Sequence, residues 1–222
     1  MPSSIQSPRR HFLAALSFVF AAPLLLRPAR AADPVKVLAF GDSLTAGYGL
    51  KQGEGFADQL QTAFRKMGRP VTVINGGVSG DTSAGGLSRI DWAMADKPAV
   101  VILELGANDM LRALDPDSTR NNLGGIIAKA QAAGAKVLLC GMKAQRNLGA
   151  EYVQKFDALY PDLAKQYGVP LYPFFLAGIL AADGTADTTL LQPDGLHPTE
   201  AGAKRIVDDI MPALLKLLDA PT

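Results

Sequence analysis

The sequence predicts an α/β fold in three layers, in which a five-stranded parallel sheet of flavodoxin-like order 2-1-3-4-5 carries helices on both faces. Short apolar runs of strand length alternate along the chain with segments whose apolar residues recur at helical spacing. The strand-length runs are almost continuously apolar, which is typical of strands covered on both faces. Regular alternation of strand and helix favours a parallel sheet, and five strands in one domain favour this order.

Five apolar runs are expected to form the strands. The first four end before a glycine or an Asn-Gly-Gly turn, and the short fifth run ends before a proline. The expected strands are Lys36–Phe40, Val71–Ile74, Val100–Leu105, Lys136–Cys140 and Pro170–Tyr172. The single cysteine lies in the fourth run, where a buried and chemically inert thiol is expected.

Five other segments are expected to form the helices. Each carries apolar residues three or four positions apart, which is the spacing of one helix face. They are Gly55–Met67, Thr82–Met94, Ser118–Ala133, Gly149–Tyr167 and Thr199–Leu218. A helix between successive strands is the usual crossover in a parallel sheet.

Composition restricts the class of protein further. About 48% of the residues are apolar and 19% are charged, which excludes a disordered, collagen-like or coiled-coil chain. The formal net charge of +1 gives no basic excess of the kind that nucleic-acid binding requires. A single cysteine excludes an internal disulfide framework and a zinc site built from several cysteines.

Residues 1–31 are expected to form a secretory signal peptide rather than part of the fold. They include four arginines, no acid, and an apolar stretch, Phe12–Leu26, that is short for a membrane-spanning helix. The segment Ala29-Arg30-Ala31 fits a small-x-small cleavage pattern. The pair Arg9-Arg10 resembles a twin-arginine export signal, although Pro8 stands where that signal prefers Ser or Thr. A retained N-terminal anchor is the alternative interpretation.

Cleavage after Ala31 leaves residues 32–222 as one exported domain, periplasmic or secreted in a bacterium, with no transmembrane span. Its basic residues then number 18 against 21 acidic ones, so the mature domain is mildly acidic. Cleavage also removes His11 and leaves His197 as the only imidazole.

Glycine-containing polar turns follow the strands at the end where ligands bind in open α/β sheets. These turns are therefore expected to meet on one rim. They place Ser43 after the first strand, Gly80 after the second, Asn108 after the third, and Asp194 with His197 on a long loop after the last.

These residue types suit acyl transfer. A serine needs a base to take its proton, and His197 is the only imidazole of the mature chain. Asp194, three residues earlier, can reach the ring from its own loop and fix its tautomer. The candidate donors to a developing oxyanion are the Ser43 N–H, the Gly80 N–H and the Asn108 amide.

Other interpretations remain open at this stage. Gly-Asp-Ser alone is commonly a helix N-cap, and Asp-x-x-His alone is commonly a surface loop. Residues Ser43–Gly47 superficially resemble the flavin-phosphate loop of a redox module. A non-catalytic domain that binds envelope lipid or polysaccharide is a further class. An oxygen-rich metal site would use Asp42, Asp81, Asp194 and His197.

Four blocks of the sequence resemble those of the SGNH (GDSL) hydrolase family. They are VLAFGDSLTAGYGL, INGGVSGDTSAGGLSRI, LELGANDMLR and QPDGLHPTEAG, and the likeness runs from about Val37 to Leu218. It is strongest to the bacterial periplasmic subgroup with thioesterase, arylesterase and lysophospholipase activity, which also resembles this chain at GMKAQRNLG.

The resemblance implies an SGNH fold and a serine esterase that acts on acyl esters, thioesters or lysophospholipids and needs no metal or organic cofactor. It implies Ser43 as nucleophile, with Asp194 and His197 completing the triad. It also implies that Gly80 and Asn108 join Ser43 in the oxyanion hole and that Asp42 supports the nucleophile loop. Carbohydrate O-acetyl esterases use the same blocks and are the alternative within hydrolases.

Further residues are expected to contact substrate. The loop Met142–Gly149 is expected to set acyl-chain preference, because it opens onto the same rim and carries Gln145 where the subgroup usually has proline. A second departure is Ala107, where a second glycine is common. The candidate lining residues are Gly47, Tyr48, Met142, Asn147 and Phe175, for each of which simple packing is the alternative.

Overall fold

The fold is known from a computed structural model, which describes residues 1, 3 and 33–220. The predicted signal peptide, including its arginine pair and its cleavage site, lies outside the described residues apart from Met1 and Ser3.

The described chain forms one five-stranded parallel sheet in the order β2-β1-β3-β4-β5, which confirms the predicted fold class. The strands are β1 (Val35–Gly41), β2 (Val71–Gly77), β3 (Val100–Glu104), β4 (Lys136–Cys140) and β5 (Leu171–Tyr172). Because β1 and β3 are central neighbours, the turns that follow them meet at the same edge of the sheet.

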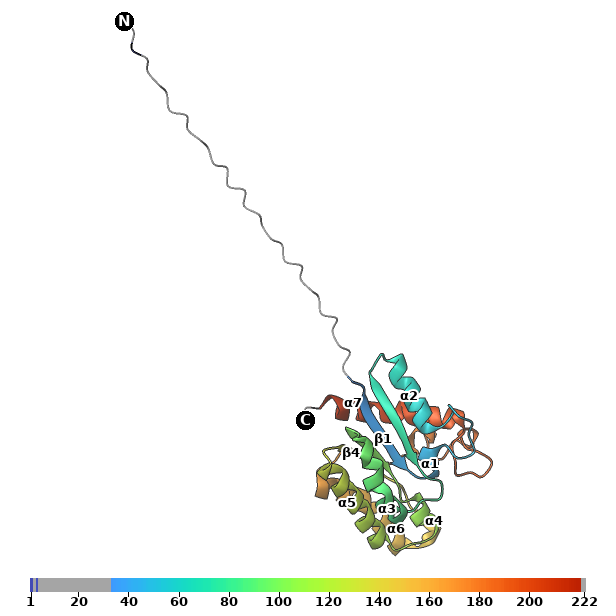
Figure 1. The fold of residues 1–222 in the computed structure, drawn as a ribbon. Coiled ribbons are helices and arrows are strands. Elements are labelled where there is room, and N and C mark those ends of the chain that lie inside the picture. The colour runs from blue at the N-terminus through green and yellow to red at the C-terminus, as the bar shows by residue number, and fades with distance from the viewer. Residues whose placement is uncertain (2, 4–32, 221–222) are drawn as a thin grey trace. The chain divides into compact units, whose positions relative to one another are not determined.

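Helices cover both faces of this sheet (Figure 1). One face carries α1 (Ser43–Ala46), α2 (Phe56–Lys66) and α7 (Glu200–Asp219). The other carries α3 (Ser83–Ala93), α5 (Pro116–Ala132) and α6 (Ala150–Tyr167). A short helix, α4 (Ala107–Leu111), follows β3. Single 3-10 turns lie at η1 (Met94–Asp96), η2 (Arg146–Leu148), η3 (Ala177–Ile179) and η4 (Thr188–Leu190).

The boundaries differ from the predicted ones where backbone contacts override local pattern. β2 runs three residues past Ile74, because Gly76 and Gly77 still pair with the end of β1. α5 begins at Pro116 rather than Ser118, since the Asp115 side chain caps it by accepting two backbone N–H groups. The helical turn α4 was not predicted, because five residues are too few to show a period.

The core is a continuous apolar cluster between the sheet and both helix layers. The central strands β1 and β3 are buried along almost their whole length, as their apolar runs predicted. Phe56 and Phe64 of α2 are buried under one layer, and Phe156 and Tyr160 of α6 under the other. Cys140 is fully buried, as expected, and this burial raises the pKa of its thiol well above the ordinary value.

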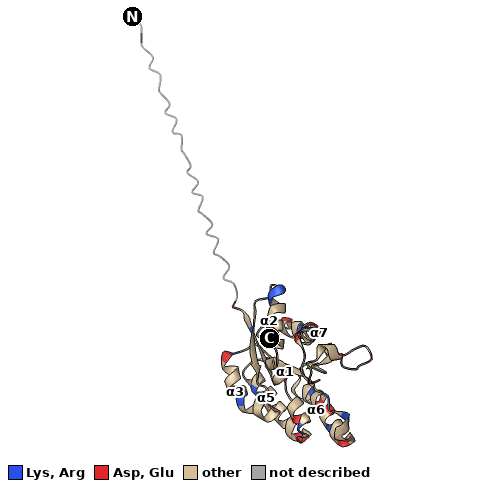
Figure 2. Ribbon diagram, turned by 90° about the vertical axis from the view of Figure 1, so that its right-hand side faces the viewer, with Lys and Arg blue, Asp and Glu red and all other residues tan. Residues whose placement is uncertain are grey.

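Charged residues of both signs are mixed over the helices in the view of Figure 2. Arg65 and Lys66 lie in the last turn of α2, where positive charge opposes the partial negative charge of a helix C-terminus. Within residues 33–220, no helix is both long and apolar enough to cross a membrane.

Candidate active site

The turn after β1 places a serine at the start of a helix. Asp42 is the N-cap of α1, and its Oδ1 accepts the Leu44 N–H at 3.0 Å. Ser43 is therefore the first helical residue, and its own N–H has no acceptor inside the helix. Gly41 has no space for a side chain, because an added Cβ would lie 2.5 Å from Glu104 Oε2. The turn that carries Ser43 is thus packed tightly against β3.

The loop before α7 holds a histidine by local hydrogen bonds. Asp194 Oδ1 accepts the N–H groups of Leu196 at 2.9 Å and His197 at 3.0 Å, and its Oδ2 lies 2.7 Å from His197 Nδ1. These backbone bonds, followed by the bond to the imidazole, lower the pKa of Asp194 to about 2. Asp194 is therefore ionised at any ordinary pH and acts only as an acceptor.

The serine and the histidine meet across the top of the sheet. His197 Nε2 lies 2.8 Å from Ser43 Oγ, although the two residues are 154 positions apart. Because the Asp194 carboxylate can only accept, the proton of a neutral imidazole lies on Nδ1, and this N–H donates a hydrogen bond to Asp194. The free lone pair on Nε2 then faces the serine hydroxyl, which is the arrangement that general-base activation requires.

Gln192 and Tyr48 connect the histidine loop to the turn that follows α1. Gln192 Nε2 donates to the backbone oxygens of Tyr48 at 2.7 Å and Pro198 at 2.9 Å. The Tyr48 ring lies 4.7 Å from the His197 ring, centroid to centroid, at a tilt of 42°. Tyr48 therefore supports the imidazole and also forms part of the cavity wall.

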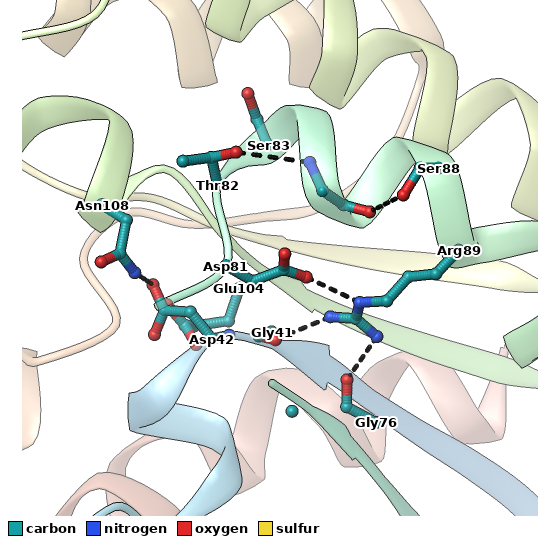
Figure 3. A network of polar contacts seen from close by, with 12 residues as sticks. Gly41, Asp42, Gly76, Asp81, Thr82, Ser83, Ser88, Arg89, Glu104 and Asn108 are labelled. Atoms are coloured by element: carbon teal, nitrogen blue, oxygen red, sulfur yellow. Dashed lines mark hydrogen bonds and ion pairs between the residues drawn. The ribbon is translucent and has the colours of Figure 1, made fainter. Parts of the chain in front are cut away.

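The candidate oxyanion donors Ser43, Gly80 and Asn108 line the same cavity as His197. Gly80 has a φ of +82°, a left-handed conformation that an L side chain rarely adopts. Asn108 Nδ2 donates one hydrogen to Asp42 Oδ2 at 3.0 Å, which leaves its second hydrogen for a ligand (Figure 3). Asp42 thus connects the Ser43 turn to the Asn108 side chain.

Two carboxyl groups lie buried beneath this site. Glu104 is fully buried, and its Oε2 accepts from the Thr45 hydroxyl at 2.7 Å and the Asp42 N–H at 3.3 Å. Burial raises the pKa of Glu104 well above its usual range, and it also raises the pKa of Asp42 to about 6. Donors from Leu44 and Asn108 favour the charge on Asp42. We therefore assign the proton of this coupled pair to Glu104 near neutral pH.

A cavity of about 270 Å³ opens beside Ser43 and His197. Gly80 and Asn108 form part of its wall, so the site residues predicted from four strand ends are brought together around one space. Among the predicted lining residues, Tyr48 and Met142 contact it. Most of the remaining wall is apolar, formed by Leu44, Met110, Leu111, Phe174, Leu176 and Leu196.

Three predicted lining residues lie elsewhere. Phe175 is fully buried and packs against Phe56, while its neighbour Phe174 lines the cavity, so the prediction for Phe175 is wrong. The two phenylalanines lie in the turn after β5, and the sequence did not show which of them faced the rim. Gly47 ends α1 with a left-handed φ and borders a smaller neighbouring pocket. Asn147 lies on the exposed turn η2, outside the cavity wall.

Several residues that support the site were not predicted from the sequence. Glu104 left a signal, as a lone acid in an otherwise apolar strand. Asp109 is also buried and accepts from the Ser83 N–H and hydroxyl, which ties α4 to the start of α3. Arg89 and Gln192 left no signal, because nothing local separates them from surface residues.

The structure bears on two of the other interpretations. Asp81 is paired with Arg89 at 2.7 Å, and Asp42 accepts from Leu44 and Asn108, so these two carboxylates are committed to protein donors. Among residues 33–220, no three His, Cys, Asp or Glu side chains are grouped to hold a metal ion. A flavin-phosphate loop is also disfavoured, because buried carboxyl groups lie beneath Ser43–Gly47 where a phosphate would need donors.

Comparisons with known proteins identify the family of the chain. Residues 39–205 match the model of the GDSL-like Lipase/Acylhydrolase family. The chain is similar to the esterase TesA of Pseudomonas aeruginosa, with 40% identity over 82% of this chain and 89% of the relative. It is 35% identical to thioesterase 1/protease 1/lysophospholipase L1 of Escherichia coli K12, over 87% of this chain and 88% of the relative. The crystal structure of AlinE4, an SGNH-hydrolase family esterase, covers 86% of this chain and 100% of its own, with 45% identity and a TM-score of 0.69.

Proposed function

The chain belongs to the GDSL-like lipase/acylhydrolase family, and from that premise we propose that it is an exported serine esterase that hydrolyses acyl esters and thioesters through Ser43, His197 and Asp194. The observation that carries the proposal is the unbroken contact from Ser43 Oγ to His197 Nε2, at 2.8 Å, and from His197 Nδ1 to Asp194, at 2.7 Å.

The reaction proceeds through a covalent acyl-enzyme. Ser43 Oγ attacks the carbonyl carbon of the substrate while His197 Nε2 takes the hydroxyl proton. His197 then returns that proton to the departing alcohol or thiol. Water, deprotonated by the same nitrogen, attacks the carbonyl carbon of the acyl group. The bond to Ser43 Oγ then breaks, His197 returns the proton to that oxygen, and the carboxylic acid is released. Asp194 holds the ring in position and stabilises the imidazolium that forms twice in the cycle.

The negative charge that forms on the carbonyl oxygen of the substrate is stabilised by a separate set of donors. The Ser43 N–H, the Gly80 N–H and the second hydrogen of Asn108 Nδ2 are the proposed donors. Asp42 aims the Asn108 amide by accepting its other hydrogen at 3.0 Å. These donors are neutral and already held in place, so they need not reorganise when negative charge develops on the carbonyl oxygen.

The cavity favours an acyl chain over a sugar as the bound group. Its wall beyond the donors is formed mainly by Met110, Met142, Phe174, Leu176 and similar apolar side chains. Such a surface gains free energy by burying methylene groups and offers few partners to sugar hydroxyls. Acyl esters, acyl thioesters and lysophospholipids are therefore the proposed substrate classes.

The test of the mechanism is a pair of measurements on Ser43. A serine-reactive phosphonate should label the protein, and peptide mapping should place the adduct on Ser43. Ser43→Ala should abolish ester hydrolysis while the unfolding transition stays close to that of the wild type. Labelling at Ser79 or Ser83, or an active Ser43→Ala variant, would overturn the assignment. Failure to label at all would favour a non-catalytic binding domain.

The substrate class is tested by a hydrolysis panel. Aryl esters, acyl-CoA thioesters, lysophospholipids and acetylated xylan should be compared on the same preparation. The proposal requires higher kcat/KM on the first three than on acetylated xylan. Preference for the xylan would establish the carbohydrate O-acetyl esterase instead.

We also propose that residues 1–31 direct export and are removed. The support is the sequence pattern of arginines, apolar stretch and Ala29-Arg30-Ala31. The mass of the protein recovered from the periplasm should correspond to a chain that starts at Ala32. Replacing Arg9 and Arg10 together by lysine should block export only if the twin-arginine route is used.

A further inference from the structure

Arg89 of α3 connects the carboxyl ends of β1 and β2 to the turn that follows β2 (Figure 3). Its Nε donates to Asp81 Oδ2 at 2.7 Å, its Nη1 to Gly76 O at 2.7 Å, and its Nη2 to Gly41 O at 2.9 Å. The guanidinium also lies over the Phe40 ring, 4.0 Å from the centroid. All three of its nitrogens are therefore bonded to the edge of the sheet that carries the site.

The acceptors of Arg89 stand next to the proposed oxyanion donors in the chain. Gly41 is two residues before Ser43, and Asp81 directly follows Gly80. Gly41 O also accepts the Val78 N–H at 3.0 Å, so the two segments are already joined at the point that Arg89 contacts. A shift of Gly41 or of Asp81 would move one N–H donor relative to the other.

The environment makes this connection strong. The side chains of Arg89 and Asp81 are 20% and 14% exposed, so water competes weakly for their hydrogen bonds. A guanidinium is planar and presents its N–H groups in a fixed fork, which lets it bind two carbonyls and a carboxylate together. A lysine ammonium at the same place is a single point and cannot span all three acceptors.

We propose that Arg89 is a positioning residue for the oxyanion hole, and that it sets the placement of the Ser43 N–H relative to the Gly80 N–H. This inference rests on the proposed function. The residues that line the cavity do not include Arg89, so it acts through the two loops rather than on substrate. Because those donors bind most tightly to the charge of the transition state, losing Arg89 should lower kcat more than it raises KM.

The test variant is Arg89→Lys, which keeps the charge and loses the fork. We expect kcat to fall at least about 10-fold, a part of the effect of removing one oxyanion donor outright, while KM changes less than about 3-fold. The rate of phosphonate labelling at Ser43 should fall by a similar factor, because that reaction also places charge in the oxyanion hole. A wild-type kcat in folded Arg89→Lys, or a rise in KM alone, would overturn the proposal.

Two control variants separate positioning from stability. Arg120→Lys changes an exposed arginine that pairs with Asp162 at 3.0 Å on the α5–α6 face, and it should leave kcat unchanged. Ile127→Val removes a methyl group from a fully buried core position, and it should lower the unfolding temperature without lowering kcat at 25 °C. If Ile127→Val lowered kcat as much as Arg89→Lys did, the effect of Arg89 would be structural and the inference would fail.

A second variant tests the contacts of Arg89 in case Arg89→Lys does not fold. Asp81→Asn leaves the two carbonyl contacts of Arg89 and weakens only the third. Asp81→Asn should give a smaller fall in kcat than Arg89→Lys, with KM nearly constant. An unchanged kcat in Asp81→Asn would overturn the positioning role of Arg89. Ser43→Ala keeps the two proposals apart, since its activity tests the nucleophile alone. An inactive Ser43→Ala beside a fully active Asp81→Asn or Arg89→Lys would overturn the role of Arg89 and leave the proposed function standing.

Discussion

The nucleophile half of the site, formed by Ser43 and Asn108, rests on the buried carboxylate of Asp42, whereas the histidine half, formed by His197, rests on the exposed carboxylate of Asp194. Asp42 is fully buried and bonds to Asn108, 66 positions away. Asp194, by contrast, keeps 38% of its side chain exposed, and the groups that donate to its carboxylate lie within three residues. The nucleophile half is therefore assembled by the sheet, while the geometry of the histidine half is mostly a property of its own loop.

This difference separates two ways of losing activity. A change in the nucleophile half disturbs donors that support one another and leaves buried polar groups without partners, which also costs stability. A change in the histidine loop removes chemistry from a segment that contributes little to the core. Variants in the two halves should therefore differ in how strongly rate and stability fall together.

The largest expected effect is in the histidine half. Asp194→Asn can still accept the backbone N–H groups of the loop, but its amide cannot stabilise the imidazolium and favours the wrong tautomer. We expect kcat to fall by about 10⁴-fold, with little change in the unfolding temperature. Steady-state kinetics and thermal unfolding on the same sample would check this. A large loss of stability would contradict the view that this loop is held locally.

His197→Gln should lower kcat by a similar factor at every pH, because within residues 33–220 no second histidine can replace His197.

The pKa of Asp194, about 2, means that its carboxylate stays ionised across the working range. Protonation of Asp194 should therefore leave no step in the pH–rate profile above about pH 4. Such a step, if it vanished in Asp194→Asn, would show that the carboxylate titrates during catalysis.

Asn108→Ala tests the nucleophile half. We expect kcat to fall by about 10²–10³-fold, the usual effect of removing one oxyanion donor. It should also destabilise the protein, since Asp42 loses a hydrogen-bond donor at a buried site. Kinetics would separate this from ground-state binding, in which KM would rise and kcat would stay constant.

Glu104→Gln probes the buried carboxyl pair through stability. Folding raises the pKa of Glu104 above its ordinary value of 4.5. At a pH above that value, the folded protein therefore binds more protons than the unfolded protein does. The free energy of unfolding should therefore decrease as the pH rises from about 4.5 toward the folded pKa. Glutamine mimics the protonated acid, so Glu104→Gln should weaken that decrease and gain relative stability as the pH rises. Unfolding measured at pH 5 and pH 8 would check this, and an unchanged slope would contradict it.

The smallest expected effect concerns the loop after β4. Gln145 has a φ of −65°, which proline also adopts, and within residues 33–220 its N–H donates no hydrogen bond. Gln145→Pro should thus fold normally and gain up to about 1 kcal/mol of stability by restricting the unfolded chain. Gln145 lines the cavity, so the ratio of kcat/KM on short and longer acyl esters should shift. An unchanged ratio would place chain-length preference elsewhere, for example at Phe174 or Leu176.

Much of this protein was predictable from the sequence, because the relevant signals are local. Strand-length apolar runs and helical spacing indicated the order of elements, and parallel strands bring their carboxyl ends to one edge. Ser43, Gly80 and Asn108 follow successive strands, so their meeting on one rim followed from topology alone. The pairing of Asp194 with His197 was also predictable, since both residues lie on one short loop.

Tertiary structure alone decided the support of that rim. Arg89, Glu104 and Gln192 act across 48, 59 and 144 positions of sequence, and no local pattern marks such partners. It also decided that Phe174 rather than Phe175 faces the cavity, because two neighbouring apolar side chains in a turn suit the core and the cavity wall equally well. Periodicity records which residues avoid water. The distances that give Ser43 its base and its donors exist only once the strands pack side by side.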